Sequence, residues 1–230
     1  MTQTLSIIIP ALNEGADIES TLSVLLPPQA RGAEIIVVDG GSVDDTLIIA
    51  SRCADQVLEA PSGRAVQMNA GAAVANGDAL FFLHADSLPP PEVDKLILDA
   101  LSSGDYVWGR FDVRISGAAP LLPLVASMMN LRSRLTSIAT GDQGIFMTRT
   151  AFDAIGGFPP IPLMEDVAAS RALKRLGRPA CLREKIVASG RRWDKHGAAR
   201  TILLMWRLRA AYFFGADPER LARRYRDDPR

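Results

Sequence analysis

The sequence predicts an α/β protein with a mostly parallel central sheet, and two observations lead to this prediction. Short apolar runs alternate with helical patterns along the first half of the chain. Repeated strand–helix alternation implies right-handed crossovers and hence parallel strands. Polar residues that include an acid directly follow two of the apolar runs, at Asp39 and at Asp86. Because ligands bind outside the carboxyl ends of the strands in such a sheet, the two acids predict a nucleotide site.

The first half of the chain supplies the alternation. An apolar run at residues 5–9 predicts a strand, and Asn13 is a suitable cap for a helix over residues 14–26. The prolines at 89–91 end the last strand pattern of this half. The other strands are expected at 34–38, 56–58 and 80–83, and the other helices at 44–52, 63–74 and 92–101.

The second half is less regular. Residues 106–115 alternate apolar and polar side chains from Gly109 onward, as a half-exposed strand would. Residues 121–139 predict a Met- and Leu-rich helix that is broken near Pro123. No repeat or linker separates two cores, so we expect one domain over residues 1–193 with a helical C-terminal extension over 194–230. The remaining strands are expected at 144–147 and 180–187, and the remaining helices at 167–176, 198–214 and 219–225.

The charges balance overall but not locally. The 230 residues include 26 basic and 26 acidic side chains, which argues against a dedicated nucleic-acid binder. From Arg191 onward, however, eleven Arg and Lys residues face five Asp and Glu residues. A helical cap with a solvated charged face is the favoured interpretation of this basic tail. Contact with anionic lipid or a phosphorylated ligand is the alternative.

Nothing in the sequence predicts secretion or a membrane span. The N-terminus lacks a secretory signal pattern, and no stretch reaches the roughly 18 apolar residues that a spanning helix requires. Cys53 and Cys181 lack metal-ligand spacing and are expected to be buried free thiols in a reducing compartment. We therefore expect a cytoplasmic protein, either soluble or peripheral to the inner face of the membrane.

The two turns nearest the N-terminus offer groups for a nucleoside. Asn13 and Glu14 carry an amide and a carboxylate that could hydrogen-bond a ribose or a base edge, although a helix cap fits them equally well. Asp39 precedes a glycine pair, and Gly41 lets a ligand approach the backbone closely. The spacing matches neither a dinucleotide fingerprint nor a phosphate loop, which weakens the NAD and ATP hypotheses.

Two further segments offer groups for a diphosphate. Arg64 stands near a helix N-terminus and could hold a diphosphate, or it is an ordinary surface arginine. His84, Ala85 and Asp86 follow an apolar strand, where an exposed carboxylate suits a hard divalent cation that holds a phosphate. One His-x-Asp triplet is weak evidence alone, and its position gives it weight. No His/Cys cluster predicts structural zinc.

Two segments of the second half of the chain could bind an acceptor, that is, a molecule whose hydroxyl group receives a transferred group. Gly141, Asp142 and Gln143 precede a strand and could line an acceptor pocket or form a plain turn. Glu165 and Asp166 open a helix, where acids are favourable to the helix dipole. The alternative is a general base, because a hydroxyl acceptor must lose a proton as it attacks.

A basic pair with an indole precedes the C-terminal helices. Arg192 could neutralise a departing diphosphate. Trp193 could pack beside a sugar or anchor the loop.

These motifs, in this order, resemble those of the family 2 inverting glycosyltransferases of the GT-A fold. The resemblance extends over most of residues 5–193. The combination of residues 84–86, 141–144 and 191–193 is most similar to a bacterial subfamily linked to arsenosugar biosynthesis. The landmarks of the wider family are Pro10 to Glu14, Asp39 with Gly41, Ser42, Asp44 and Thr46, Asn69 with Gly71, Asp86, Glu165 with Asp166, and Arg192 with Trp193.

The resemblance implies an α/β/α sandwich with a Rossmann-like half, and it implies residue roles. Asp86, with His84, would hold Mg²⁺ or Mn²⁺, although the family usually has an acid where His84 stands. Asp166 would be the base, with Glu165 and Arg192 beside it. Gly141, Asp142, Gln143 and Trp193 would face the acceptor, and the donor nucleotide would contact Pro10, Ala11, Asn13, Glu14, Asp39, Gly41, Arg64, Asn69 and Ala85.

The implied reaction is a single displacement from a nucleotide-diphosphate sugar, expected to be a UDP-sugar, to a hydroxyl of a small-molecule or lipid-linked acceptor. A sugar-phosphate nucleotidyltransferase is the second enzyme class, and it would carry a Gly-rich activating loop where this chain has residues 11–14. A non-catalytic nucleotide- or lipid-binding protein is the third, and it would not require Glu165 and Asp166. Only part of the Gln-x-x-Arg-Trp signature is present, which disfavours a processive synthase. The helix with Met128 and Met129 and residues 206–214 could hold an apolar acceptor, a membrane surface or a partner subunit, although burial inside one core is the default. The C-terminal helices could thus contact a membrane peripherally or form a homodimer.

Overall fold

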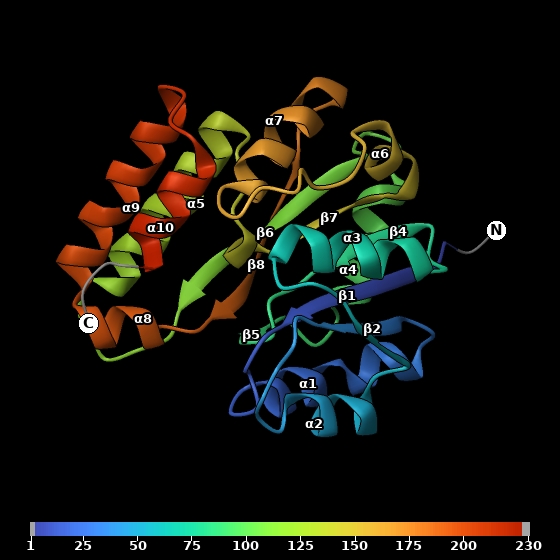
Figure 1. Cartoon of the computed structure of the whole chain (residues 1–230). Helices are drawn as coiled ribbons and strands as arrows, with labels where there is room; N and C mark the ends of the chain where they lie inside the picture. The colour runs from blue at the N-terminus through green and yellow to red at the C-terminus, as the bar shows by residue number, and fades with distance from the viewer. Residues whose placement is uncertain (1–2, 227–230) are drawn as a thin grey trace.

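A single eight-stranded sheet forms the centre of the protein (Figure 1). The computed structural model describes residues 3–226, apart from the side chains of residues 192, 195, 196, 198, 199 and 226. The strands are β1 (Leu5–Ala11), β2 (Glu34–Asp39), β3 (Gln56–Glu59), β4 (Ala79–Phe82), β5 (Ser87–Leu88), β6 (Trp108–Ile115), β7 (Ile145–Thr148) and β8 (Ala180–Ala188).

Helices connect and cover these strands. A short 3₁₀ turn, η1 (Gly141–Gln143), precedes β7. The α-helices are α1 (Ile18–Ala30), α2 (Thr46–Cys53), α3 (Arg64–Val74), α4 (Val93–Ser102), α5 (Leu122–Thr136), α6 (Arg149–Ala154), α7 (Glu165–Leu176), α8 (Arg191–His196), α9 (Ala198–Phe213) and α10 (Pro218–Arg226).

The sheet has the order β3-β2-β1-β4-β7-β6-β8-β5. Strands β1 to β4 pair in parallel, as do β6 and β8. Strand β7 runs antiparallel to both of its neighbours, and β5 runs antiparallel to β8. The predicted α/β class with a mostly parallel sheet is therefore confirmed. The carboxyl ends of β1, β2 and β4 share one edge, where a ligand site is expected.

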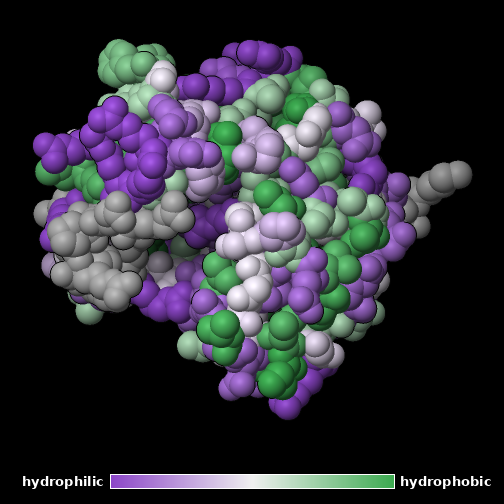
Figure 2. All heavy atoms as spheres, in the orientation of Figure 1, coloured by the Kyte–Doolittle hydropathy of each residue, from purple (hydrophilic) through white to green (hydrophobic). Residues whose placement is uncertain are grey.

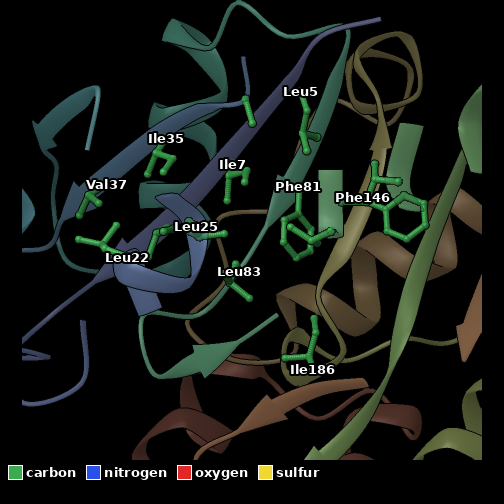
Figure 3. Packing of buried hydrophobic residues seen from close by; sticks show 14 of the residues in the cluster. Leu5, Ile7, Leu22, Leu25, Ile35, Val37, Phe81, Leu83, Phe146 and Ile186 are labelled. Atoms are coloured by element: carbon green, nitrogen blue, oxygen red, sulfur yellow. The ribbon is translucent and has the colours of Figure 1, made fainter. Parts of the chain in front are cut away.

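Side chains alternate between the two faces of the sheet, and each face carries its own helices. Ile7 and Ile9 of β1 join the core under α1, α2 and α4, whereas Ile8 joins the core under α3, α6 and α7. Figure 3 shows side chains of the first core, where Leu22 and Leu25 of α1 pack against neighbouring strands. Burial of one such side chain stabilises a fold by about 1.5–3 kcal/mol. These two cores hold the strand ends of the site in place.

The C-terminal helices pack on the rest of the protein through two smaller clusters. Leu208 of α9 and Leu221 of α10 are buried with Met164 and Val167 at the start of α7. Helix α5 packs on β6 and β8 and carries partly buried side chains toward α9. Figure 2 shows mainly hydrophilic side chains over α9 and α10 on the visible face. The two predicted C-terminal helices are confirmed as elements.

Two predicted helices differ from those in the structure. The helix expected at 14–26 begins at Ile18 and ends at Ala30, because residues 14–17 form a turn instead. Asn13 does not cap it: this residue has a left-handed φ of 54°, and its side-chain oxygen accepts the N–H of Val43. Helix α5 is not broken at Pro123, which lies in its first turn, where a missing N–H is tolerated.

Other differences are smaller. Residues 87–88 form a short strand that pairs with β8, although the prolines that follow predicted an end to the strand pattern. Turn η1 and helices α6 and α8 were also not predicted. Cys53 and Cys181 are free thiols, as expected, but both are partly exposed rather than buried. Among the described helices, none is both long and apolar enough to cross a bilayer.

Candidate active site

A polar pocket of about 360 Å³ lies at the carboxyl ends of β1 and β4. The register explains why these ends meet: Ile8 pairs with Phe82, and the N–H of Leu83 donates to the carbonyl of Ile8. The start of α3, the turn before α7 and one side of α10 complete its walls. We call it the donor pocket, and the expected site residues that line it are Pro10, Ala11, Glu14, Arg64, His84, Ala85, Asp86 and Glu165.

Three carboxylates at the edge of the donor pocket share one arginine. The Arg191 guanidinium lies 2.7 Å from a carboxylate oxygen of Glu14 and 3.1 Å from one of Asp86. Its other terminal nitrogen forms an ion pair of 2.5 Å with Asp17. Desolvation and the charge of Asp86 raise the pKa of Glu14, although the hydrogen bond from Arg191 opposes this effect. The acids predicted at Glu14 and Asp86 are thus neighbours, and their shared cation comes from α8.

Arg191 is a residue that the sequence interpretation missed, because the prediction assigned the diphosphate to Arg192. The side chain of Arg192 lies outside the described residues, so its predicted role stays a prediction. The sequence alone contains no signal that distinguishes these two adjacent arginines. The fold distinguishes Arg191, because β8 ends beside β5 and directs α8 toward the strand-end acids.

A second group of side chains joins His84 to the acceptor-side turn. The Nδ1 atom of His84 lies 3.4 Å from a carboxylate oxygen of Asp142. Burial works against the charge of Asp142, but the hydrogen bond and charge of His84 outweigh it and lower the pKa of Asp142. A Cβ atom on Gly141 would lie 2.3 Å from Nε2 of His84, so only glycine lets η1 approach the imidazole this closely. His84 and Asp142 therefore connect the two sides of the site.

The adjacent acids at the start of α7 face different neighbours. Glu165 is 7% exposed and lines the donor pocket. Asp166 accepts hydrogen bonds from the N–H of Gly141 at 2.9 Å and of Val167 at 2.6 Å. Desolvation raises the pKa of both carboxyls, and each acid has a carboxylate neighbour that raises it further: Asp166 for Glu165, and Asp142 for Asp166. A raised pKa brings a carboxylate closer to the range of an effective proton acceptor.

Arg64 supplies positive charge in the wall of the donor pocket that the start of α3 forms. It stands at the first position of α3, beside the left-handed Gly63, and its side chain is exposed. The surrounding chain desolvates the guanidinium, but the charges of Glu165, Asp142 and Asp166 outweigh this effect and raise the pKa of Arg64. An anion in the donor pocket would therefore meet a cation at the N-terminal end of a helix.

Asp39, expected to contact the base, uses its carboxylate within its own loop. It is fully buried, and its oxygens accept hydrogen bonds from the N–H groups of Gly41 and Ser42 and from the hydroxyl of Ser42. Asn13 hydrogen-bonds the same loop, through Ser42 and Val43. Neither Asp39, Gly41 nor Asn13 lines the donor pocket. In this structure the three residues shape the two turns beside it.

Two more expected site residues hydrogen-bond the chain elsewhere. The amide of Asn69 exchanges two hydrogen bonds with the backbone of Phe158, at 2.8 and 2.9 Å. Gln143 is fully buried and forms a capping box with Thr140 around η1. These side chains hold in place the loop before α7 and the turn η1. Contacts from them to a ligand stay predictions.

A second pocket, of about 310 Å³, lies between α5 and α9. Asp142 and the half-buried Trp193, to which the resemblance assigns an acceptor-side role, both line it, and that role stays a prediction. The two pockets approach each other at the ion pair of His84, which lines the first, and Asp142, which lines the second. We call the pocket between α5 and α9 the helical pocket. The sequence did not indicate Arg132 or Arg209 in its wall, nor Ala222 and Tyr225 of α10 in the wall of the donor pocket.

The carboxylates at the edge of the donor pocket fit a divalent cation that is bound partly by these carboxylates and partly by the oxygens of a diphosphate. No group of three or more His, Cys, Asp or Glu residues in the described part of the chain could hold a metal ion by itself. Asp86 and Glu14 nevertheless both contact one positive group, the Arg191 guanidinium. Carboxylate oxygens are the ligands that Mg²⁺ and Mn²⁺ prefer, and Mg²⁺ is commonly bound by one or two carboxylates plus substrate phosphates.

This fold, with a polar pocket at the carboxyl ends of its parallel strands, defines an α/β protein of the GT-A type. The first 349 residues of S. aureus TarS in complex with UDP superpose with a TM-score of 0.65 at 19% identity, covering 81% of this chain and 60% of that one. Glucosyl-3-phosphoglycerate synthase from Mycobacterium tuberculosis, in complex with Mn²⁺, UDP and glucosyl-3-phosphoglycerate, gives a TM-score of 0.64 at 24% identity, covering 88% and 78%. At these identities the likeness shows the fold alone.

The chain belongs to glycosyl transferase family 2, whose model matches residues 6–153. An uncharacterized glycosyltransferase of Mycobacterium tuberculosis is 37% identical over 115 residues, which are 46% of this chain and 44% of the relative. The uncharacterized glycosyltransferase YibD of Escherichia coli is 33% identical over 103 residues, which are 42% of this chain and 30% of the relative. The matches thus span less than half the length of these curated relatives.

Proposed function

We propose that this protein is an inverting glycosyltransferase that moves a sugar from a nucleotide-diphosphate donor, a UDP-sugar, to a hydroxyl acceptor. One observation carries the proposal: two acids in different environments lie on the two sides of the His84–Asp142 contact. Asp86 is paired with a cation at the strand ends, whereas Asp166 is desolvated beside the acceptor-side turn. Family membership supports the proposal, as do the UDP and UDP-GlcNAc bound in TarS structures.

The proposed reaction is one displacement. The acceptor hydroxyl oxygen forms a bond with the anomeric carbon while the bond from that carbon to the diphosphate oxygen breaks. The electron pair of the broken bond leaves with the nucleoside diphosphate, and the proton of the hydroxyl moves to the carboxylate of Asp166. The hydrogen bonds from Gly141 and Val167 hold this carboxylate in one orientation. The raised pKa of Asp166 favours it as the proton acceptor.

Positive groups of the donor pocket would hold the departing diphosphate. Arg64 lies at the start of α3, and Arg191 lies at the carboxylates, so we propose that both contact the phosphates. A divalent cation held by Asp86, Mg²⁺ or Mn²⁺, would neutralise negative charge on the diphosphate when bound. His84 stays a second candidate for this cation, although its Nδ1 atom faces Asp142. In the synthase from Mycobacterium tuberculosis, Mn²⁺ and UDP are bound together.

We further propose that residues 1–193 and 194–230 act as one catalytic unit. Two observations support this proposal: α9 and α10 share a buried cluster with α7, and Ala222 and Tyr225 of α10 line the donor pocket. The narrower resemblance, to glycosyltransferases linked to arsenosugar biosynthesis, stays a proposal about the acceptor.

Incubation with a panel of nucleotide sugars and Mn²⁺ tests the function. Slow release of nucleoside diphosphate from one donor is the expected result, because water can replace the acceptor. Release of pyrophosphate from a nucleoside triphosphate and a sugar phosphate would instead identify a nucleotidyltransferase. A lack of product with every nucleotide sugar, with and without candidate acceptors, would contradict the glycosyltransferase, and a lack of pyrophosphate from nucleoside triphosphates and sugar phosphates would contradict the nucleotidyltransferase.

A further inference from the structure

The helical pocket contains two arginines whose hydrogen-bonding groups are not satisfied. Nε and Nη2 of Arg132, on α5, are buried and have no hydrogen-bond partner. The same is true of Nε of Arg209, on α9. Both side chains line this pocket. Of all side-chain nitrogen atoms in the described residues, the only others that are buried without a partner belong to Arg110.

Such groups are costly to bury. A charged N–H group that leaves water without gaining an acceptor loses far more free energy than an ordinary hydrogen bond supplies. Desolvation accordingly lowers the pKa of Arg132, and the charges of Asp166 and Asp142 only partly offset it. No hydrogen bond joins Arg132 to either acid in the described structure. Guanidinium groups match both carboxylate and phosphate, and a phosphate group has enough oxygens to accept from all three of these unpaired donors.

Apart from Asp142, the rest of the pocket wall is apolar or aromatic. Met128 and Met129 on α5 face Ile202 and Met205 on α9, and Trp193 and Trp206 add two indoles. Methionines adapt to apolar ligands of varied shape. Met128 is 48% exposed and Trp206 is 59% exposed, so the apolar end of the pocket reaches solvent. This combination fits a molecule with one anionic group and one apolar chain.

The position of the pocket relates it to the proposed chemistry. Asp142 belongs to its wall and lies 3.4 Å from His84 in the wall of the donor pocket. Asp166 hydrogen-bonds the N–H of Gly141, the residue next to Asp142. A molecule in the helical pocket would therefore lie beside Asp142, which contacts the wall of the donor pocket and adjoins the residue that hydrogen-bonds the proposed base.

We propose that the helical pocket binds the acceptor, and that this acceptor is a phosphorylated amphiphile. Its phosphate lies between Arg132 and Arg209, its apolar chain lies along the methionines and indoles, and its free hydroxyl faces Asp166. The pocket as a site for such a molecule stands on the observations above. Its identification as the acceptor site rests on the proposed glycosyltransferase function.

Octyl phosphate, used below its micelle concentration, is a suitable probe. Trp193 and Trp206 line the pocket, whereas Trp108 is fully buried in the sheet, so intrinsic fluorescence reports on binding. We expect octyl phosphate to bind at least ten times more tightly than octanol or inorganic phosphate. Arg132→Gln and Arg209→Gln should each weaken its binding by roughly tenfold or more, the usual effect of losing a charge-assisted hydrogen bond. Arg207→Gln, an exposed arginine on the same helix as Arg209, should leave it unchanged.

Two measurements separate this proposal from the proposed function. Calorimetric titration with UDP and Mn²⁺ should give the same affinity in all four proteins, which also verifies that the variants are folded. Equal affinities for octyl phosphate and octanol, or full retention of octyl phosphate binding by both Arg132→Gln and Arg209→Gln, would overturn the phosphate site even where UDP binds normally. Arginine-dependent binding of octyl phosphate without any UDP binding would instead overturn the assignment of the bound molecule as an acceptor.

Discussion

The two pockets differ in how their charges are balanced. At the edge of the donor pocket, three carboxylates have a partner within the protein, because Arg191 contacts Glu14, Asp17 and Asp86 together. In the helical pocket, buried nitrogen atoms of Arg132 and Arg209 have no hydrogen-bond partner. A ligand must therefore displace an internal partner in the first pocket, whereas in the second it supplies a missing one. The difference predicts that loss of the internal partner Arg191 changes binding in the first pocket only a little, whereas loss of one arginine in the second pocket changes it strongly.

The largest expected effect is on the group that we place between the pockets. Asp166→Asn should lower the rate of sugar transfer roughly 10²- to 10⁴-fold, the usual contribution of a general base. UDP binding should stay near that of the unmodified protein, because the substitution leaves the donor pocket unchanged. Steady-state kinetics and calorimetry measure the two quantities, with the exposed Asp153→Asn as a matched control. Normal turnover of Asp166→Asn would remove Asp166 as the base.

The pH dependence of transfer sharpens the same assignment. The folded-state pKa of Asp166 lies above the ordinary value of 3.8, chiefly because of desolvation. The base acts only when it is deprotonated, so kcat/KM should fall as the pH falls through this raised pKa. The acid limb should consequently lie at a higher pH than an ordinary aspartate would give. An acid limb at the ordinary value would separate activity from the titration of this carboxyl.

Substitution of Asp86 tests its proposed role in holding a divalent cation in the donor pocket. Asp86→Ala should weaken the Mn²⁺-dependent binding of UDP by at least the roughly 10- to 100-fold that loss of an outer-sphere partner costs a metal site. UDP binding without metal should change little. Calorimetric titration with and without Mn²⁺ measures both, and Asp99→Ala, an exposed acid on α4, is the control. An unchanged metal titration would refute the role of Asp86.

Arg191 tests directly whether the internal partner can be exchanged. Arg191→Gln should tighten the binding of Mn²⁺ alone by about two- to fivefold, because an exposed ion pair contributes about 0–1 kcal/mol. The exposed Arg175→Gln on α7 should have no such effect. A lower Mn²⁺ affinity in Arg191→Gln would mean that the arginine supports the cation site instead of competing for it.

The smallest expected effect concerns stability. Desolvation raises the pKa of Glu165 above its ordinary value of 4.5, so the folded state favours the protonated form. The contribution of this group to stability is fully present in acid and is lost as the pH rises through the raised pKa. Glu165→Gln should therefore match the unmodified protein in acid and be slightly more stable at neutral pH. Urea unfolding across this range measures the difference, and an opposite sign would mean that Glu165 is stabilised as an anion.

The donor side could be predicted from sequence because its residues follow strands directly. The positions of Asp86 and Glu14 at one edge follow from the parallel register of β1 and β4, which an alternating strand–helix pattern already implies. Residue type and local sequence predicted less well which of these residues would contact a ligand. Asp39 and Asn13 carry suitable groups, but in the structure they hydrogen-bond the turns beside the pocket.

The sequence indicated the helix with Met128 and Met129 and residues 206–214 as possible places for an apolar acceptor. The pocket between them and its two arginines could not be predicted, because they depend on which helix faces meet. Arg132 and Arg209 lie on helices separated by two strands and three other α-helices in the chain. Periodicity gives each helix an apolar face, but it does not say which neighbour covers that face. Arg191 was missed for a similar reason: its contact with Asp86 joins segments 105 residues apart, and the pairing of β5 with β8 creates it.

Helix α10 has one further consequence. Its side chain of Leu221 is buried against α7, and the adjacent Ala222 lines the donor pocket. A ligand that contacts one side of the helix thus stabilises the same turn that the core holds from the other side. Because transient opening of α10 would remove part of the pocket wall, a bound nucleotide should suppress that opening by mass action. Backbone amides of α10 should therefore exchange their hydrogens more slowly when the donor pocket is filled.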